Sequence, residues 1–246
     1  MRAILFDFGG TLDFPRHWLD RFVAHYQAAG LDIERAELDR AFSAATEKAY
    51  ARSAMLRNHS LSQLVRFLVE LQFENLREGG SAALPHLLTQ AASGGIITDI
   101  KIRICDSFLA ESAVGLAISR PLLALLARRF KIGVVSNFYG NLARVIAEAD
   151  LARSVTVIAD SGRLGFYKPD PRIFASSLAQ LGVNPHDAVM VGDSINNDCA
   201  PARAMGMNAV WLRHGEFSAC EASSSDPVDF TIDRLEELRD FGWLAG

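Results

Sequence analysis

Five short runs rich in isoleucine, valine and leucine constrain the fold of this chain most strongly. They read AILFDF, KIGVVSN, VTVIAD, AVMVGD and NAVWL. Their apolar character is nearly continuous rather than alternating, which is typical of strands buried on both faces of a parallel sheet. Helical patterns such as NLARVIAEADL and PRIFASSLAQLG lie between them. This repeated order of strand and helix predicts an α/β fold, a doubly wound parallel sheet with right-handed crossovers.

The stretch from residue 14 to 116 follows a different pattern. Apolar residues recur there at helical spacing, as in HWLDRFVAHYQAAG and LSQLVRFLVELQFENL, with no convincing strand. The sequence therefore predicts two domains, a core formed by residues 1–13 and 117–246 and an inserted all-helical domain at 14–116.

Glycine pairs and aromatic residues mark the inside of this insertion. The pairs Gly79–Gly80 and Gly94–Gly95 are expected to interrupt its helices, because glycine is a poor helix former. The aromatic residues, among them Trp18, Phe22 and Tyr26, are expected mainly to pack between the helices.

Composition excludes several classes of partner. The net charge is −4 and no run is dense in lysine or arginine, so no nucleic-acid partner is expected. No window reaches the roughly 18 uncharged apolar residues of a membrane span, so no membrane partner is expected. The three cysteines form no CxxC pair, which favours a reducing compartment. We expect a cytoplasmic protein that is a monomer or a homodimer.

Polar residues stand where the predicted strands end. Asp7 follows AILF, Ser136 and Asn137 follow KIGVV, and Asp193 follows AVMV. Ligands of open parallel sheets bind at the carboxyl ends of the strands, near the point where the strand order reverses. These side chains, together with Lys168 in the loop GFYKPDP, are therefore expected to meet at one rim.

The segments DFGGTL, VVSN, YKPDP and GDSINND, in this order, resemble the four motifs of the haloacid dehalogenase superfamily of hydrolases. The resemblance covers the whole predicted sheet domain. The helical insertion is similar in place and type to the cap that part of this family carries after its first strand. The resemblance implies a Rossmann-like core with a helical cap, and a phosphatase that acts on a small phosphorylated metabolite through an aspartyl-phosphate, with Mg²⁺ as cofactor.

The resemblance also implies a role for each motif residue. Asp7 would be the nucleophile, since a carboxylate that attacks phosphorus splits one hydrolysis into two easier displacements. Lys168 would be catalytic by neutralising the charge of this carboxylate and of the phosphoryl group. The implied phosphate ligands are Thr11, Ser136, Asn137 and Lys168. The implied Mg²⁺ ligands are the side chains of Asp7, Asp193 and Asp198 and the backbone carbonyl of Gly9.

Gly9 departs from the pattern of the family. Its position usually carries an aspartate that protonates the leaving oxygen and then deprotonates the attacking water. Loss of such acid–base catalysis typically costs ~10²–10⁴ in rate. Asp13 and His17 follow closely on the first motif and are the candidates to replace the missing group.

Three functions are compatible with this departure. The chain could be a phosphatase whose acid–base function is weakened or relocated. It could be a catalytically impaired pseudo-enzyme that binds a phosphorylated ligand or a protein partner. It could also be a 2-haloacid dehalogenase, a branch of the family that lacks the second aspartate. Dehalogenases resemble DxYGT at the first motif, however, and GDSINND favours phosphate.

Overall fold

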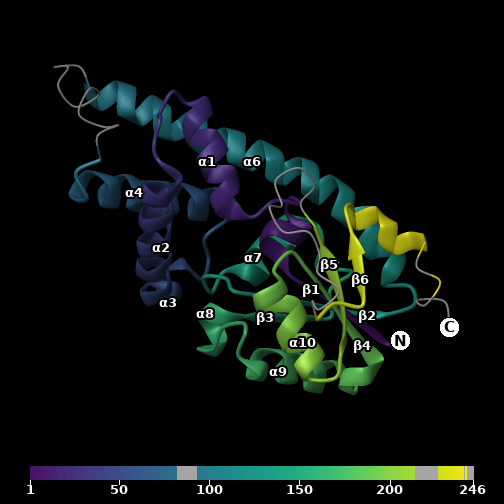
Figure 1. Cartoon of the computed structure of the whole chain (residues 1–246). Helices are drawn as coiled ribbons and strands as arrows, with labels where there is room; N and C mark the ends of the chain where they lie inside the picture. Colours follow the sequence, from purple (N-terminus) through teal and green to yellow (C-terminus); the bar gives the residue numbers. More distant parts are fainter. Residues whose placement is uncertain (82–92, 214–226, 241, 243–246) are drawn as a thin grey trace.

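A six-stranded parallel sheet forms the centre of the computed structural model, which describes residues 1–81, 93–213, 227–240 and 242. The strand order is β3-β2-β1-β4-β5-β6 (Figure 1). Every residue of β1 and β4 is buried, as their continuous apolar runs predicted. The α/β fold is thus confirmed. The strands are β1 (Ala3–Phe6), β2 (Lys131–Ser136), β3 (Val157–Asp160), β4 (Ala188–Gly192), β5 (Asn208–Leu212) and β6 (Phe230–Ile232).

The strand order reverses beside β1. After β1 the chain adds β2 and β3 on one side, and it then crosses to place β4 on the other side of β1. Phe6 pairs with Val191 in the parallel register, so the residues that follow these two strands emerge next to each other. This is the place where parallel sheets bind ligands.

Helices cover both faces of the sheet. On one face, Ile4 and Phe6 belong to an apolar cluster with α7. On the other face, Ala3 and Leu5 pack with α9 and α10. The helices that follow β2 are α7 (Leu142–Glu148), α8 (Ser161–Leu164), α9 (Pro171–Leu181) and α10 (Ala200–Ala204). Short helical turns span Phe8–Leu12, Pro185–Asp187, Ile195–Cys199 and Leu235–Asp240.

The inserted segment is helical in its described residues, as predicted. Its helices are α1 (Trp18–Ala28), α2 (Arg35–Ala51), α3 (Ser53–Leu56), α4 (Leu61–Glu78) and α6 (Ser93–Leu126). α4 begins at a capping box of Ser60 and Gln63 and ends at Gly79, which confirms one predicted glycine break. The other prediction was wrong, because Gly94 and Gly95 lie in the first turn of α6. Each glycine costs a helix only about 1 kcal/mol, which the packing of a long apolar helix offsets.

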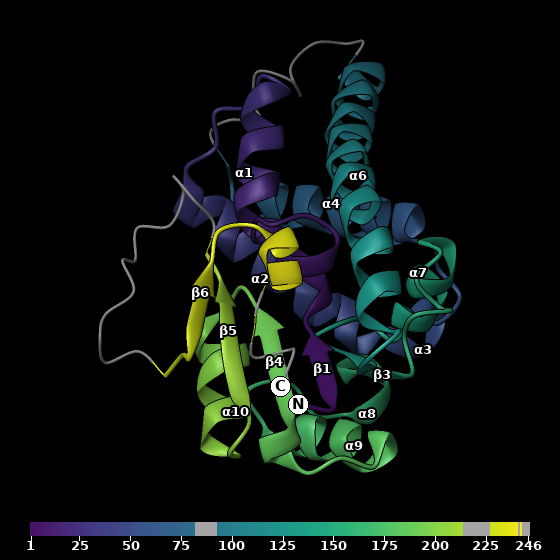
Figure 2. The same ribbon diagram turned by 90° about the vertical axis from the view of Figure 1, so that its right-hand side faces the viewer.

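α6 joins the two parts of the molecule. It continues through the predicted boundary at residue 116 and ends at Leu126 beside the sheet (Figure 2). Its segment Gly95–Leu126 has the length and hydropathy of a membrane span. In this fold the helix packs on α1, on α4 and on the turn Leu235–Asp240. These contacts bury 39% of its most apolar window. The division into two domains stays a prediction.

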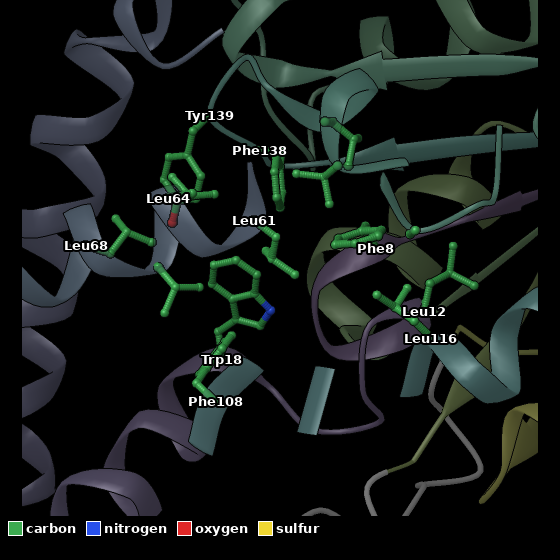
Figure 3. Close-up of a cluster of buried hydrophobic side chains, with 14 of the residues drawn as sticks. Phe8, Leu12, Trp18, Leu61, Leu64, Leu68, Phe108, Leu116, Phe138 and Tyr139 are labelled. Carbon is green, nitrogen blue, oxygen red and sulfur yellow. The ribbon is translucent and has the colours of Figure 1, made fainter. Parts of the chain in front are cut away.

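One apolar cluster crosses from the helical insertion to the sheet. Figure 3 shows Trp18 and Phe108 of the insertion near Phe138, which follows β2. The Trp18 ring meets Phe108 edge to face at 5.1 Å and Phe138 at 5.8 Å between centroids. Phe138 in turn meets Phe8, in the turn after β1, at 5.5 Å. The insertion is thus packed onto the carboxyl edge of the sheet.

Candidate active site

Asp7, Lys168 and Asp198 form a buried ion-pair cluster at this edge. The Lys168 Nζ donates to Asp7 Oδ1 at 2.7 Å and to Asp198 Oδ1 at 2.6 Å. Asp7 follows β1, Lys168 lies in the loop before α9, and Asp198 lies in the turn after β4. The structure therefore brings together three predicted site residues that are far apart in the sequence.

Asp193 adds a third carboxylate to the cluster. Oxygen atoms of Asp7, Asp193 and Asp198 all lie within 4.8 Å of one another. Gly10 makes room for Asp193, because a Cβ on Gly10 would lie only 2.5 Å from Asp193 Oδ2. The φ of Gly10 is +89°, which also favours glycine. Glycine is therefore required at position 10 both by the Asp193 carboxylate beside it and by its backbone conformation.

The charge of this cluster suits a cation. Burial raises the pKa of Asp7 and of Asp198, and the charge of Asp193 adds to that rise, whereas Lys168 opposes it. Burial favours neutral Lys168, but Asp198 and Asp7 outweigh it and raise the pKa of the ammonium. Three carboxylates thus face one ammonium. Clustered carboxylate oxygens are the ligands that hard divalent cations take, so the residues present fit such an ion.

The loop that follows β2 is held in place by hydrogen bonds. The Asn137 side chain donates to the Lys168 carbonyl at 3.0 Å and accepts from the Lys168 amide at 2.7 Å. Its side chain therefore positions the lysine loop, a task that the phosphate-binding prediction did not include. The Ser136 hydroxyl, by contrast, interacts with the charged Asp7 carboxylate and opposes the rise of its pKa.

Asp160, at the end of β3, fixes the continuation of the same loop. Its carboxylate accepts from the amides of Gly140, Gly162 and Leu142, each at 2.9 Å. Asp160 is not among the predicted site residues, although it ends the apolar run VTVIAD in the same way as Asp7 ends AILFD.

A pocket of about 170 Å³ opens above the cluster, between the sheet and the helical insertion. Predicted phosphate ligand Thr11 does not line it and is instead buried in the turn after β1. Of the two candidate acid–base residues, His17 lines the pocket and Asp13 does not. The described lining residues are Asp7, Gly9, His17, Trp18, Phe42, Thr46, Tyr50, Ser136, Asn137, Phe138, Tyr139, Lys168, Asp193, Ser194, Asn197 and Asp198.

Trp18 occupies the space beside Gly9. A Cβ on Gly9 would lie 3.1 Å from Trp18 Nε1 and 3.5 Å from Cδ1 of the same ring. The backbone of Gly9, at φ −77° and ψ 117°, is one that any residue adopts. Glycine at this position is therefore explained by the indole ring and not by the backbone. Trp18 was predicted mainly as a packing residue of the insertion, and it also lines the pocket.

Asp13 holds this indole ring in place. It accepts hydrogen bonds from Trp18 Nε1 at 2.8 Å, from the Gly10 amide at 2.8 Å and from Arg21 Nη1 at 2.7 Å. Asp13 and Arg21 are both fully buried. Burial raises the pKa of Asp13, and the charge of Arg21 opposes that rise. The structure thus gives Asp13 a positioning role at the start of the insertion, away from the reacting groups.

Comparison with known proteins identifies similar chains. A family model described as haloacid dehalogenase-like hydrolase matches residues 1–206. Glyceraldehyde 3-phosphate phosphatase of Methanopyrus kandleri is 42% identical over 81 residues, which are 32% of this chain and 35% of that protein. The matched segment thus spans about a third of the length of the curated relatives.

Solved structures share the fold over nearly the whole chain. A phosphatase from Thermococcus onnurineus has a TM-score of 0.53 at 22% identity, covering 98% of this chain and 97% of that chain. A 2-haloacid dehalogenase from Pseudomonas syringae has a TM-score of 0.51 at 23% identity, with the same coverage of 98% and 97%. At such identities the likeness shows the fold alone, and both chemistries occur on it.

Proposed function

We propose, because the chain belongs to the haloacid dehalogenase-like hydrolase family, that it is a Mg²⁺-dependent phosphatase of small phosphorylated metabolites. The observation that carries this proposal is the cluster of Asp7, Lys168 and Asp198 with Asp193 beside it, at the floor of the pocket. The phosphatase name of the curated relative supports the same chemistry.

Asp7 acts as the nucleophile in two displacements. In the first, an Asp7 oxygen attacks phosphorus, the ester P–O bond breaks, and the alcohol oxygen leaves with the bonding electrons and takes a proton. In the second, water attacks phosphorus, the bond to Asp7 breaks, and phosphate is released with the carboxylate restored. Lys168 stabilises the negative charge of both displacements, while Ser136 favours the charged form of Asp7.

The carboxylates of Asp7, Asp193 and Asp198 would hold Mg²⁺, together with the backbone carbonyl of Gly9. The ion would supply charge neutralisation to the phosphoryl oxygens when bound. Asn137 keeps Lys168 at its place through two backbone hydrogen bonds and so acts as a positioning residue.

Proton transfer is the step that this site performs least well. No carboxylate extends from Gly9, and the Asp13 carboxylate accepts three hydrogen bonds outside the pocket. His17 lines the pocket at the start of α1, with its Nδ1 accepting from the Leu19 amide at 3.3 Å. Its other ring nitrogen, Nε2, is the atom to which we assign proton transfer, and the imidazole must first be protonated before it gives a proton to the leaving oxygen.

The charge of the cluster makes the dehalogenase alternative less suitable. Dehalogenation takes an anionic 2-haloacid and releases a halide anion. Asp193 places an additional carboxylate beside Asp7 and Asp198, which repels both anions. A phosphate substrate is also anionic, but its oxygens would be neutralised by the Mg²⁺ ion that the Asp193 carboxylate helps to hold.

Turnover of acetyl phosphate and p-nitrophenyl phosphate, with Mg²⁺ and with EDTA, tests the proposal. We expect Mg²⁺-dependent phosphate release and a phosphorylated Asp7 that is detectable by mass spectrometry after acid quench. Asp7→Asn should abolish both signals. Asp39→Asn, the same substitution at an exposed position of α2, should leave them unchanged.

Two results would select the other functions. Mg²⁺ binding by calorimetry without turnover or phosphorylation of Asp7 would indicate a pseudo-enzyme. Halide release from 2-haloacids without Mg²⁺, in the absence of phosphatase activity, would indicate a dehalogenase.

A further inference from the structure

The pocket has two walls of different chemistry. Its floor carries the carboxylates and Lys168, while the opposite wall comes from the helical insertion and from the loop after β2. That second wall is mainly aromatic. Its residues are Trp18, Phe42, Tyr50, Phe138 and Tyr139, with His17 and Thr46 among them.

The aromatic wall is held rigid by contacts among its own rings. Tyr50 stacks on Tyr139 with centroids 5.0 Å apart, and Trp18 contacts Phe138 at 5.8 Å and Tyr139 at 6.5 Å. The Tyr139 hydroxyl lies 3.3 Å from Thr46 Oγ1. A rigid apolar wall of this kind stabilises a ligand through burial of apolar surface.

The tyrosines of this wall carry no charge near neutral pH. Burial raises the pKa of Tyr139 to about 12, and it raises the pKa of Tyr50 further. The wall therefore offers hydroxyl groups and ring faces to a ligand, and no anionic oxygen.

Cations are scarce around the part of the pocket that a leaving group would fill. Among the described lining residues, Lys168 is the one lysine or arginine, and its ammonium already serves Asp7 and Asp198. The nearby buried Arg21 is engaged by Asp13 and Glu111. The segments 82–92, 214–226 and 241–246 contain no lysine or arginine in their sequence.

The geometry points to phosphate monoesters whose alcohol part is small, uncharged and apolar, with the aromatic wall as the specificity-determining surface. This inference rests on the proposed function, which places the phosphoryl group at the floor. A carboxylate on the alcohol part would be buried against rings without a lysine or arginine partner, which costs binding free energy. The volume of about 170 Å³ limits the ligand to one small group beside the phosphoryl group.

Three isosteric phosphonates test the inference by binding alone, since their P–C bond is not hydrolysed. They are 4-methylpentylphosphonate, 3-carboxypropylphosphonate and 3-carbamoylpropylphosphonate, which differ only at the far end. We expect calorimetry in Mg²⁺ to give the first an affinity about 30-fold or more above that of the carboxylate. The neutral amide should lie between them, which separates charge from size.

Thr46→Lys supplies the cation that the wall lacks. It should lower the preference for the methyl group over the carboxylate by about tenfold, as a new charge pair forms. Thr46→Met, of similar length without charge, should leave the preference unchanged. If Thr46→Lys does not fold, Phe42→Lys replaces it, because Phe42 lines the same wall one helical turn away.

Equal or tighter binding of the carboxypropyl ligand by the unmodified protein would overturn the inference. Acetyl phosphate turnover reports on the proposed function separately, because this substrate has almost no alcohol part to select. A protein that turns over acetyl phosphate but prefers the carboxylate would keep the function and lose the inference. A protein that binds the phosphonates with the expected preference but turns over no acetyl phosphate would keep the binding preference and lose the proposed function.

Discussion

Restoring an aspartate at Gly9 is expected to help catalysis only when Trp18 is also changed. The new Cβ of Gly9→Asp would lie 3.1 Å from Trp18 Nε1. This ring cannot easily retreat, because Asp13 accepts its N–H and two phenylalanines contact its faces and edges. Trp18→Leu removes the indole ring that faces Gly9 while keeping an apolar side chain in the cluster.

The magnitudes follow from packing and from acid–base catalysis. Overpacking destabilises a protein by about 1–3 kcal/mol. Replacement of a glycine at an ordinary φ stabilises it by about 0.4–1 kcal/mol, because the unfolded chain loses conformational entropy. Gly9→Asp should therefore lower the free energy of unfolding by about 1–2 kcal/mol. Each kcal/mol corresponds to a fall of about 2–4 °C in Tm for a protein of this size. In the pair Gly9→Asp with Trp18→Leu, an acid–base group enters the vacated space and should accelerate phosphoenzyme hydrolysis by ~10²-fold or more.

Rapid-quench kinetics with p-nitrophenyl phosphate is the assay. The unmodified protein should show a burst near one equivalent and then slow turnover, because phosphorylated Asp7 accumulates when the water attack lacks a base. Gly9→Asp alone should leave the slow phase nearly unchanged, and the double variant should accelerate it. Gly9→Asn with Trp18→Leu is the matched control, since asparagine has the same size and transfers no proton.

Two outcomes would refute this reasoning. If Gly9→Asp alone accelerates the slow phase by ~10²-fold and leaves Tm unchanged, then Trp18 does not block the position. If the double variant is no faster than its asparagine control, the space beside Gly9 is not where the proton is transferred. Thermal unfolding of both single variants and the pair gives the coupling between the two sites, which the contact predicts to be non-additive.

Three further predictions concern the metal, the proton donor and the packing of α6. EDTA and Asp193→Asn should each lower acetyl phosphate turnover by about 100-fold or more, restored by Mg²⁺ only in the unmodified protein. His17→Ala should slow hydrolysis of an alkyl phosphate by ~10²-fold and leave hydrolysis of acetyl phosphate nearly unaffected, because acetate is a stable anion that leaves without a proton. His186→Ala, at an exposed site, is the control. Gly115→Ala should destabilise the protein by about 3 kcal/mol, because the new Cβ would lie 2.0 Å from the Asp13 carbonyl oxygen. Gly95→Ala is the control: its Cβ meets no atom within 4 Å, and the substitution should stabilise the helix slightly. An unchanged Tm in Gly115→Ala would contradict the contact.

The sheet could be predicted from the sequence because its signal is local. Each strand is a short apolar run that ends at a polar residue, and parallel strands deliver those ends to one edge. Asp7 and Asp193 meet there for that reason, and the haloacid dehalogenase resemblance is confirmed. Cytoplasmic location, the monomer or homodimer state and the lack of a nucleic-acid partner stay predictions, since one chain carries no direct signal for them.

The roles of individual side chains were harder to predict, because they depend on contacts between distant segments. Asn137 also holds the Lys168 backbone, 31 residues away in the sequence, which no motif indicates, and its binding of phosphate stays a prediction. Thr11 is buried in its turn and is not among the described lining residues of the pocket, so its contact with phosphate stays a prediction. A motif gives the residues that gather at a site, whereas the division of tasks among them follows from which partner each one meets.

Gly9 shows how a departure from a motif is stabilised by the rest of the chain. An empty place beside a buried carboxylate would leave a void or admit water, and close-packed interiors tolerate neither without cost. Here the Trp18 indole fills that place, and the Asp13 carboxylate fixes the indole, with Arg21 compensating the buried charge. Trp18, Asp13 and Arg21 therefore all oppose the return of an aspartate at position 9 by a single substitution. A protein with this arrangement keeps its nucleophile, lysine and carboxylates, and its activity depends on where the proton is transferred. His17 is the pocket residue of the described chain whose chemistry suits that task, and the kinetic difference between alkyl and acyl phosphates is the measurement most sensitive to it.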